Sequence, residues 1–162
     1  MRFFIVLISI LVSTINYAST QKTNINSLPK YSLKYDPARD PFKDGYAAIE
    51  NAKMTQRRIL IEVGGEWCSW CHMIERFLDE NPDVKIALHQ TFVILKVNVS
   101  DSNDNQAFLS SLPKPLGYPH MYVSEKDGTI LLSKDTAELI SDGQYSRQKF
   151  LEFIKYWTLE NE

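Results

Sequence analysis

Residues 59–72 read Ile-Leu-Ile-Glu-Val-Gly-Gly-Glu-Trp-Cys-Ser-Trp-Cys-His and hold both cysteines of this 162-residue chain. Four of the five residues at 59–63 are apolar, and three of these are β-branched, which is typical of a buried central strand. Gly64 and Gly65 end that pattern, and apolar residues recur at helical spacing from Cys68 to about Glu80. The sequence therefore predicts that both cysteines lie where a strand is followed by a helix.

This junction favours a reactive cysteine. The free N–H groups and aligned peptide dipoles at a helix N-terminus favour a negative charge, so we expect the thiolate of Cys68 to be stabilised. Cys71 follows three residues later, about one helical turn, and its sulfur can attack a mixed disulfide formed by Cys68. We therefore predict thiol–disulfide exchange that requires no cofactor and no metal.

A purely structural disulfide is the simplest alternative for these cysteines. A disulfide stabilises a fold mainly through the loop that it closes, and the ring between Cys68 and Cys71 is very short. The remaining chain is long enough to bury a core of its own. The pair is therefore better explained by chemistry than by stability.

Around the junction, the sequence predicts alternating helices and strands. Asp40 and Pro41 form a helix-start signal, after which Phe42, Tyr46 and Ile49 recur at helical spacing. The expected helices are 41–56, 68–80, 84–90, 106–112 and 146–158, and the expected strands are 59–63, 92–99, 120–124 and 129–133. This order indicates an α/β fold with a parallel strand pair linked across a helix and an antiparallel pair near the end.

The first residues have the layout of an export signal. Arg2 precedes an apolar run from Phe3 to Ile15, and Ala18 and Ser19 offer small residues for cleavage. The run is shorter than the roughly 20 residues that span a membrane, and an uncleaved anchor is the alternative. The expected organisation is a signal peptide at 1–18, a polar extension on the surface at 19–40, and one domain at 41–162.

Export would place the protein in a periplasm or otherwise outside the cell, where disulfides persist. The formal net charge of −2 offers no basic excess for a nucleic-acid partner. We expect a monomer.

Residues 62–80 resemble the active-site strand and helix of the thioredoxin superfamily. Trp67 precedes a Cys-x-x-Cys motif, as in the family, and Glu62 stands six residues before Cys68, where the family carries a buried acid. Pro119, just before the predicted hairpin, matches the cis-proline that faces the disulfide in the family. The resemblance covers about residues 45–159.

The resemblance implies a thioredoxin fold, with a central mixed β-sheet flanked by helices, and an N-terminal extension. It implies that Glu62, desolvated by apolar neighbours, takes the proton of Cys71. The residue before the cis-proline is Tyr118, whose backbone would pair with the substrate. With Trp67 and Trp70 it would form an apolar surface for peptide substrates.

The implied partners are proteins with thiols or disulfides and a membrane protein that supplies or removes electrons. Ser69 and Trp70 differ from the common dipeptides between the two cysteines, so the direction of electron flow is not carried over from the family. We expect a reductase or isomerase rather than an oxidase.

Two other functions remain open from the sequence. Residues 68–72 also match the Cys-x-x-Cys-His motif of c-type haem attachment, with His72 as one axial ligand and Met121 or Met73 as the other. A non-catalytic thioredoxin-fold module could instead bind unfolded proteins through its aromatic residues. Zinc would need a fourth ligand beside Cys68, Cys71 and His72.

Overall fold

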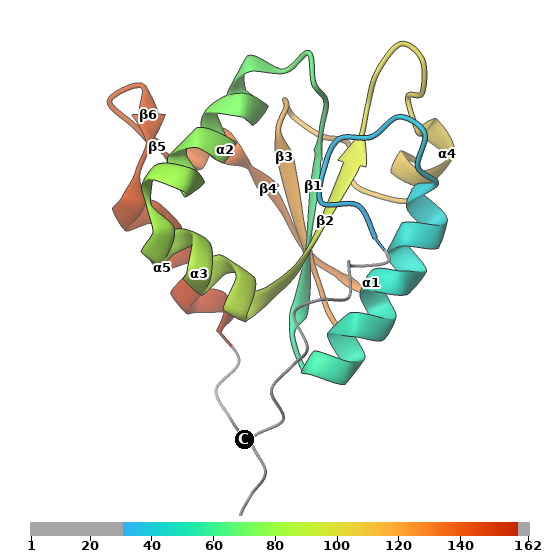
Figure 1. Cartoon of the computed structure of the whole chain (residues 1–162), viewed down its shortest axis with the longest axis horizontal. Coiled ribbons are helices and arrows are strands. Elements are labelled where there is room, and N and C mark those ends of the chain that lie inside the picture. Colours follow the sequence, from blue (N-terminus) through green and yellow to red (C-terminus); the bar gives the residue numbers. More distant parts are fainter. Residues whose placement is uncertain (1–30, 159–162) are drawn as a thin grey trace, which may run out of the picture.

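The structure, a computed structural model, describes residues 31–158 (Figure 1). The predicted signal peptide and residues 19–30 lie outside the described residues, as do residues 159–162. No helix within 31–158 has the length and apolar character needed to cross a membrane.

The centre of the fold is a four-stranded mixed sheet. Its strands are β1 (Arg58–Gly64), β2 (Phe92–Asn98), β3 (His120–Ser124) and β4 (Ile130–Asp135). Their spatial order is β2-β1-β3-β4, with β1 parallel to β2 and antiparallel to β3, and β3 antiparallel to β4. The parallel pair requires a crossover, which two helices between β1 and β2 provide. The predicted α/β class and mixed sheet are therefore confirmed.

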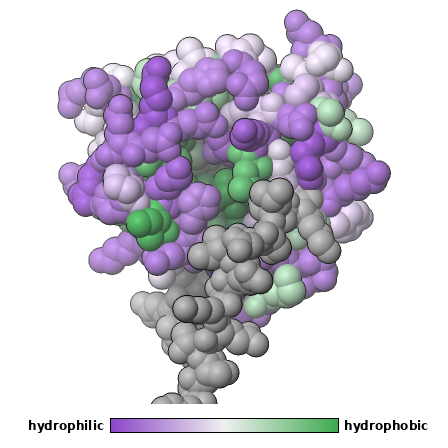
Figure 2. Space-filling model, viewed as in Figure 1, coloured by the Kyte–Doolittle hydropathy of each residue, from purple (hydrophilic) through white to green (hydrophobic). Residues whose placement is uncertain are grey.

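Helices cover both faces of this sheet (Figure 1). One face carries α2 (Ser69–Glu80), α3 (Pro82–Thr91) and α5 (Arg147–Trp157), and the other carries α1 (Pro41–Thr55) and the short α4 (Gln106–Leu109). Hydrophilic residues cover most of the face in Figure 2, with a small hydrophobic area near its centre. This distribution is expected when helices turn their apolar sides toward a sheet.

The side chains of β1 point alternately to the two faces of the sheet, and so contribute to two separate parts of the core. Leu60 packs with residues of α2, α3 and α5, whereas Ile59, Ile61 and Val63 pack against the layer that contains α1. Because side chains alternate along a strand, Glu62 lies on the same face as Leu60. The sheet therefore directs this carboxyl group toward the layer that contains α2.

The predicted helices and strands are present, with three differences. The first concerns α1, where Phe42 and Tyr46 are 47% and 70% exposed while Ala48 and Ala52 are fully buried. The two alanines let the helix approach the sheet closely, so the larger residues point outward. The predicted apolar face of α1 was therefore wrong for Phe42 and Tyr46, whereas Ile49 packs against the core as expected.

The second difference lies after β4, where no helix or strand was predicted before residue 146. A 3-10 helix (Thr136–Leu139) leads into a two-stranded hairpin of β5 (Ile140–Ser141) and β6 (Gln144–Tyr145). Strands of two residues are too short to give a visible alternation of polar and apolar residues. The hairpin buries Tyr145 against the α2 side of the core.

The third difference is residues 31–40, which were expected on the surface. Tyr31, Ser32 and Tyr35 are buried, and the backbone N–H of Lys96 in β2 donates to the carbonyl of Ser32 at 3.0 Å. The Asp44 carboxylate accepts from the N–H of Ser32 at 3.2 Å. This N-terminal segment is therefore an integral part of the fold.

Candidate active site

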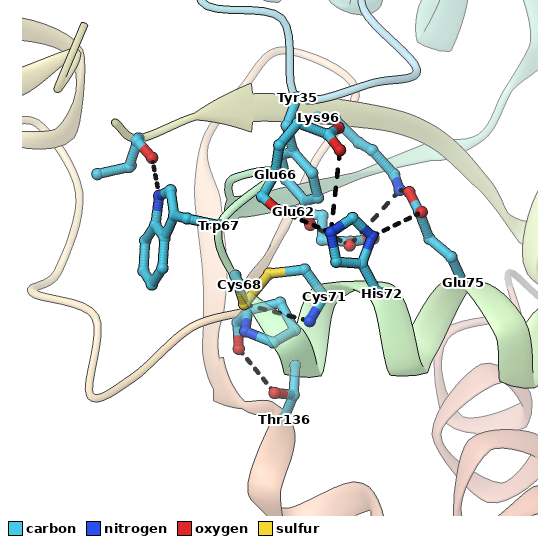
Figure 3. The surroundings of a disulfide bond; sticks show 12 residues. Tyr35, Glu62, Glu66, Trp67, Cys68, Cys71, His72, Glu75, Lys96 and Thr136 are labelled. Carbon is cyan, nitrogen blue, oxygen red and sulfur yellow. Dashed lines mark hydrogen bonds and ion pairs between the residues drawn. A yellow bond between two sulfur atoms is a disulfide. The ribbon is translucent and has the colours of Figure 1, made fainter. Parts of the chain in front are cut away.

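Cys68 and Cys71 form a disulfide at the N-terminus of α2 (Figure 3). Cys68 is the N-cap residue, and its Sγ accepts a hydrogen bond from the backbone N–H of Cys71 at 3.1 Å. Cys68 is 4% exposed and Cys71 is 0% exposed. Cys68 is therefore the more accessible of the two cysteines.

Gly64 makes room for the inner cysteine. A Cβ at this position would lie 2.6 Å from Cys71 Sγ and 3.0 Å from the phenol carbon and oxygen of Tyr35. Real Cβ contacts are not this close, so any other residue here would displace the disulfide or the tyrosine. The glycine at the end of β1 is therefore explained by the close packing of the disulfide and Tyr35 around it.

Glu62 is 2% exposed and lies among polar groups (Figure 3). The hydroxyl of Tyr35 donates a hydrogen bond to its Oε1, and the ammonium of Lys96 lies 3.8 Å from the same oxygen. Lys96 also forms an ion pair with Glu75 of α2. The expectation that apolar residues surround Glu62 was therefore wrong, because β2 and the N-terminal segment both bring polar groups to it.

Burial and the nearby carboxylates together set the ionisation of Tyr35 and Lys96. Burial, and then the charge of Glu62, raises the pKa of Tyr35 well above its usual value. Burial lowers the pKa of Lys96, but Glu62 and Glu75 outweigh it, so that this pKa is raised. Tyr35 therefore remains a hydrogen-bond donor, and Lys96 remains a cation, across the physiological range.

The peptide bond between Tyr118 and Pro119 is cis, as the family resemblance implied. The Pro119 carbonyl accepts a hydrogen bond from Thr136 Oγ1 at 2.6 Å, and Thr136 is 4% exposed. Tyr118 packs against the buried cluster of Tyr35 and the two cysteines. The loop before β3 therefore lies beside the disulfide.

The two tryptophans border the same region. Trp67 is 58% exposed, stands edge-on to Tyr118 with ring centroids 5.5 Å apart, and donates from Nε1 to the carbonyl of Val99. Trp70 is 38% exposed and lies edge-on to Tyr145 at 6.0 Å. The arrangement gives an aromatic rim around a buried disulfide, which suits contact with a peptide chain.

A family model described as thioredoxin-like matches residues 41–124. The chain belongs to the thioredoxin-like family. Its match to Spermatogenesis-associated protein 20 of Mus musculus is 30% identical over 82 residues, covering 49% of this chain and 10% of that protein. An uncharacterised protein of Caenorhabditis elegans, B0495.5, is 29% identical over 97 residues, covering 57% of this chain and 13% of its own. The chain thus spans about a tenth of the length of these curated relatives.

Solved structures show the same thioredoxin-like fold. A disulphide isomerase from Xylella fastidiosa Temecula1 superposes with a TM-score of 0.65 at 22% identity, over 77% of this chain and 96% of that chain. The oxidised C-terminal domain of DsbD from Neisseria meningitidis gives a TM-score of 0.56 at 18% identity, over 73% of this chain and 96% of that chain. At these identities the likeness concerns the fold alone.

The thioredoxin-like site does not fit haem attachment. Both sulfurs that would form the thioether bonds to a haem are buried. The ring Nε2 of His72 lies 2.7 Å from the carbonyl oxygen of Glu66, and Met121 is fully buried in the core. Met73, the other candidate, packs against the same core, so none of the three proposed axial ligands is placed for a haem.

Sequence reasoning missed four residues of this thioredoxin-like site. They are Tyr35, Lys96, Thr136 and Tyr145. Lys96 carried a visible signal, because it is the one charge within the apolar run of β2. The other three are brought to the site from distant parts of the chain, and their local sequence gives no indication of it.

Proposed function

We propose that this protein is an exported thiol–disulfide oxidoreductase that exchanges disulfides with protein substrates. The observation that carries the proposal is the Cys68–Cys71 pair at a helix N-terminus, with its more accessible sulfur outward and a buried carboxyl group behind it. A disulfide placed only for stability would need none of these surroundings.

The reaction begins with the reduced protein. The Cys68 thiolate attacks a substrate disulfide and forms a mixed disulfide, and one substrate sulfur leaves as a thiolate. Cys71 gives its proton to Glu62, and its thiolate then attacks Cys68 Sγ. The bond between Cys68 and the substrate breaks, its electron pair stays on the substrate sulfur, and the Cys68–Cys71 disulfide forms.

We infer that the protein acts as a reductase or isomerase rather than an oxidase. A strong oxidant owes its potential to a stabilised thiolate in the reduced form. Here Glu62, Glu66 and Glu75 all lie around the pair (Figure 3), with Lys96 as the one lysine drawn among them. Their excess negative charge disfavours a thiolate and so favours release of electrons to the substrate.

Export is inferred from the N-terminal sequence, and it implies a periplasmic or extracellular location. A reductase in an oxidising compartment must be re-reduced, so we propose a membrane partner that delivers electrons as a dithiol. Tyr118, Pro119, Trp67 and Trp70 would contact the substrate chain. We propose that the protein works as a monomer, because one chain holds all of these groups.

The test is a redox titration of the purified protein in glutathione buffers, followed by tryptophan fluorescence. A midpoint near that of thioredoxin, about −270 mV, supports a reductase, and one near about −120 mV indicates an oxidase. Absence of a reversible two-electron transition would refute the proposal. If Cys68→Ser retains client binding and wild type shows no turnover, the protein is a binding module instead.

A further inference from the structure

We propose that Tyr35 is a positioning residue for the resolving step, because it holds the Glu62 carboxylate in one orientation beside the cysteine pair. The inference rests on the proposed function, because it concerns the same two cysteines. It adds a residue that lies outside the part of the chain matched by the family model, residues 41–124.

Tyr35 is in contact with both the acid and the disulfide. Its hydroxyl donates to Glu62 Oε1, and its side chain clusters with Cys68 and Cys71 at 3% exposure. The space above Gly64 shows how close the groups are, because Cys71 Sγ and the Tyr35 oxygen both lie within 3.0 Å of one point there. Tyr35 therefore contacts both the carboxyl group and the cysteine pair directly.

The N-terminal segment is fixed on both sides of Tyr35. Before it, Ser32 accepts from the backbone of Lys96 and donates to Asp44. After it, the carbonyl of Pro37 accepts from Asn103 Nδ2 at 2.8 Å. A side chain between two such anchors is held in one place, as positioning a reactive group requires.

The charged and titratable groups around Glu62 come from several elements. Lys96 on β2 and Glu75 on α2 form the ion pair described above, and the phenol of Tyr145 from β6 is also within electrostatic range of Glu62. On β3, the residue paired with Glu62 is the apolar Met121. A cavity of about 310 Å³ borders Glu62, Glu75 and Lys96. Its other charged or titratable lining residues are Lys34, Asp79, Lys85 and His89.

Of these groups, only Tyr35 combines a direct hydrogen bond to Glu62 with a place in the cysteine cluster. A carboxylate that must take a proton from Cys71 needs a fixed orientation, since proton transfer requires hydrogen-bond reach. Without the phenol hydroxyl, Glu62 can turn toward Lys96 or admit water. Formation of the mixed disulfide by Cys68 does not depend on that orientation.

The experiment compares Tyr35→Phe with Tyr31→Phe in the full-length reduced protein. Tyr31 is the matched control, because it is a buried tyrosine of the same segment whose hydroxyl accepts from Asn51 Nδ2 at 2.8 Å instead. A symmetric peptide disulfide is the substrate. Acid-quenched samples analysed by mass spectrometry give separate rates for formation of the mixed disulfide and for its resolution, between pH 5 and 9.

We expect Tyr35→Phe to form the mixed disulfide at the wild-type rate and to resolve it about tenfold more slowly, part of the roughly 10²–10⁴-fold that a positioned general base supplies. The midpoint of the resolution rate against pH should move, and Tyr31→Phe should match wild type. In a Glu62→Gln background, Tyr35→Phe should have no additional effect on resolution, which separates positioning from a general loss of stability.

The inference is overturned if Tyr35→Phe resolves the mixed disulfide like wild type, or if formation and resolution slow equally. It is also overturned if Tyr35→Phe and Glu62→Gln slow the resolution of the mixed disulfide additively. Failure of the proposed function itself looks different, because then even wild type and Cys71→Ser form no mixed disulfide.

Discussion

Thr136 donates a hydrogen bond of 2.6 Å to the carbonyl of Pro119, 17 residues earlier in the chain. This bond ties the 3-10 helix after β4 to the loop that faces the disulfide. Both groups are buried, so neither finds water if its partner is removed.

Thr136→Val should therefore lower the stability of the fold and loosen the loop that carries Tyr118 and Pro119, which we call the docking loop. An unsatisfied buried carbonyl costs about 1–3 kcal/mol, which denaturant unfolding would detect. We also expect a raised KM for peptide disulfides, because Tyr118 and Pro119 lose their support. Thr55→Ala is the control, since that hydroxyl bonds to Asn51 in α1, and its KM should stay unchanged. An unchanged KM in Thr136→Val would contradict the role of this contact in docking.

Gly64→Ala should be destabilising, whereas Gly117→Ala should not. The added methyl at Gly64 meets Cys71 Sγ at 2.6 Å, but nothing lies within 4 Å of a Cβ at Gly117. Overpacking of this kind costs about 1–3 kcal/mol. Chemical denaturation of the oxidised proteins measures the difference, and equal stabilities would show that the disulfide region can rearrange freely.

Cys71→Ser should trap a mixed disulfide with a peptide substrate, and Cys68→Ser should not. The reason is that Cys68 is the more exposed sulfur and caps α2, while Cys71 is fully buried. Mass spectrometry without reductant would show the added peptide mass only for Cys71→Ser. The reverse pattern would exchange the roles of the two cysteines.

Stability should fall as the pH decreases from about 7 to 5, partly through His120. This residue is 1% exposed, and its Nε2 lies 2.8 Å from Ser133 Oγ. Burial lowers its pKa despite the opposing charge of Asp135. The unfolded chain, with a histidine pKa of about 6.5, therefore binds the proton first, and the folded state loses stability as the pH falls below that value.

His120→Gln should make the stability curve flatter between pH 7 and 5. His89→Gln is the comparison, because partial desolvation and the nearby charges of Lys85 and Arg57 lower the pKa of this histidine in α3, although its side chain is exposed. Guanidinium unfolding at a series of pH values gives both slopes. A slope for His120→Gln equal to that of wild type would remove this residue as a source of acid sensitivity.

The parts of the structure that could be predicted are those whose sequence pattern lies within one short stretch of the chain. The strand, the glycines and the cysteine spacing lie within residues 59–72, so their geometry follows from one strand and one helix. The buried acid at Glu62 and the cis bond at Pro119 were both implied by the family resemblance. The structure reproduces both positions.

What the sequence could not predict depends on distant contacts. Tyr35 is 27 residues from Glu62, and nothing in the polar stretch around it marks it as buried. The inward face of α1 was missed because Ala48 and Ala52 contribute little to an apolar pattern, although their small size is what lets the helix pack. Tyr145 was missed because its hairpin is too short to leave a pattern.

The backbone hydrogen bond between Ser32 and Lys96 limits how far the N-terminus of this protein can be shortened. β2 is an outer strand of the sheet, and the N-terminal segment occupies the backbone N–H of Lys96 there. A chain trimmed to Pro41, where the family match begins, would leave this edge open. Open edges pair with other chains, so such a fragment should aggregate. For production and crystallisation, the folding unit therefore begins at Tyr31 or earlier.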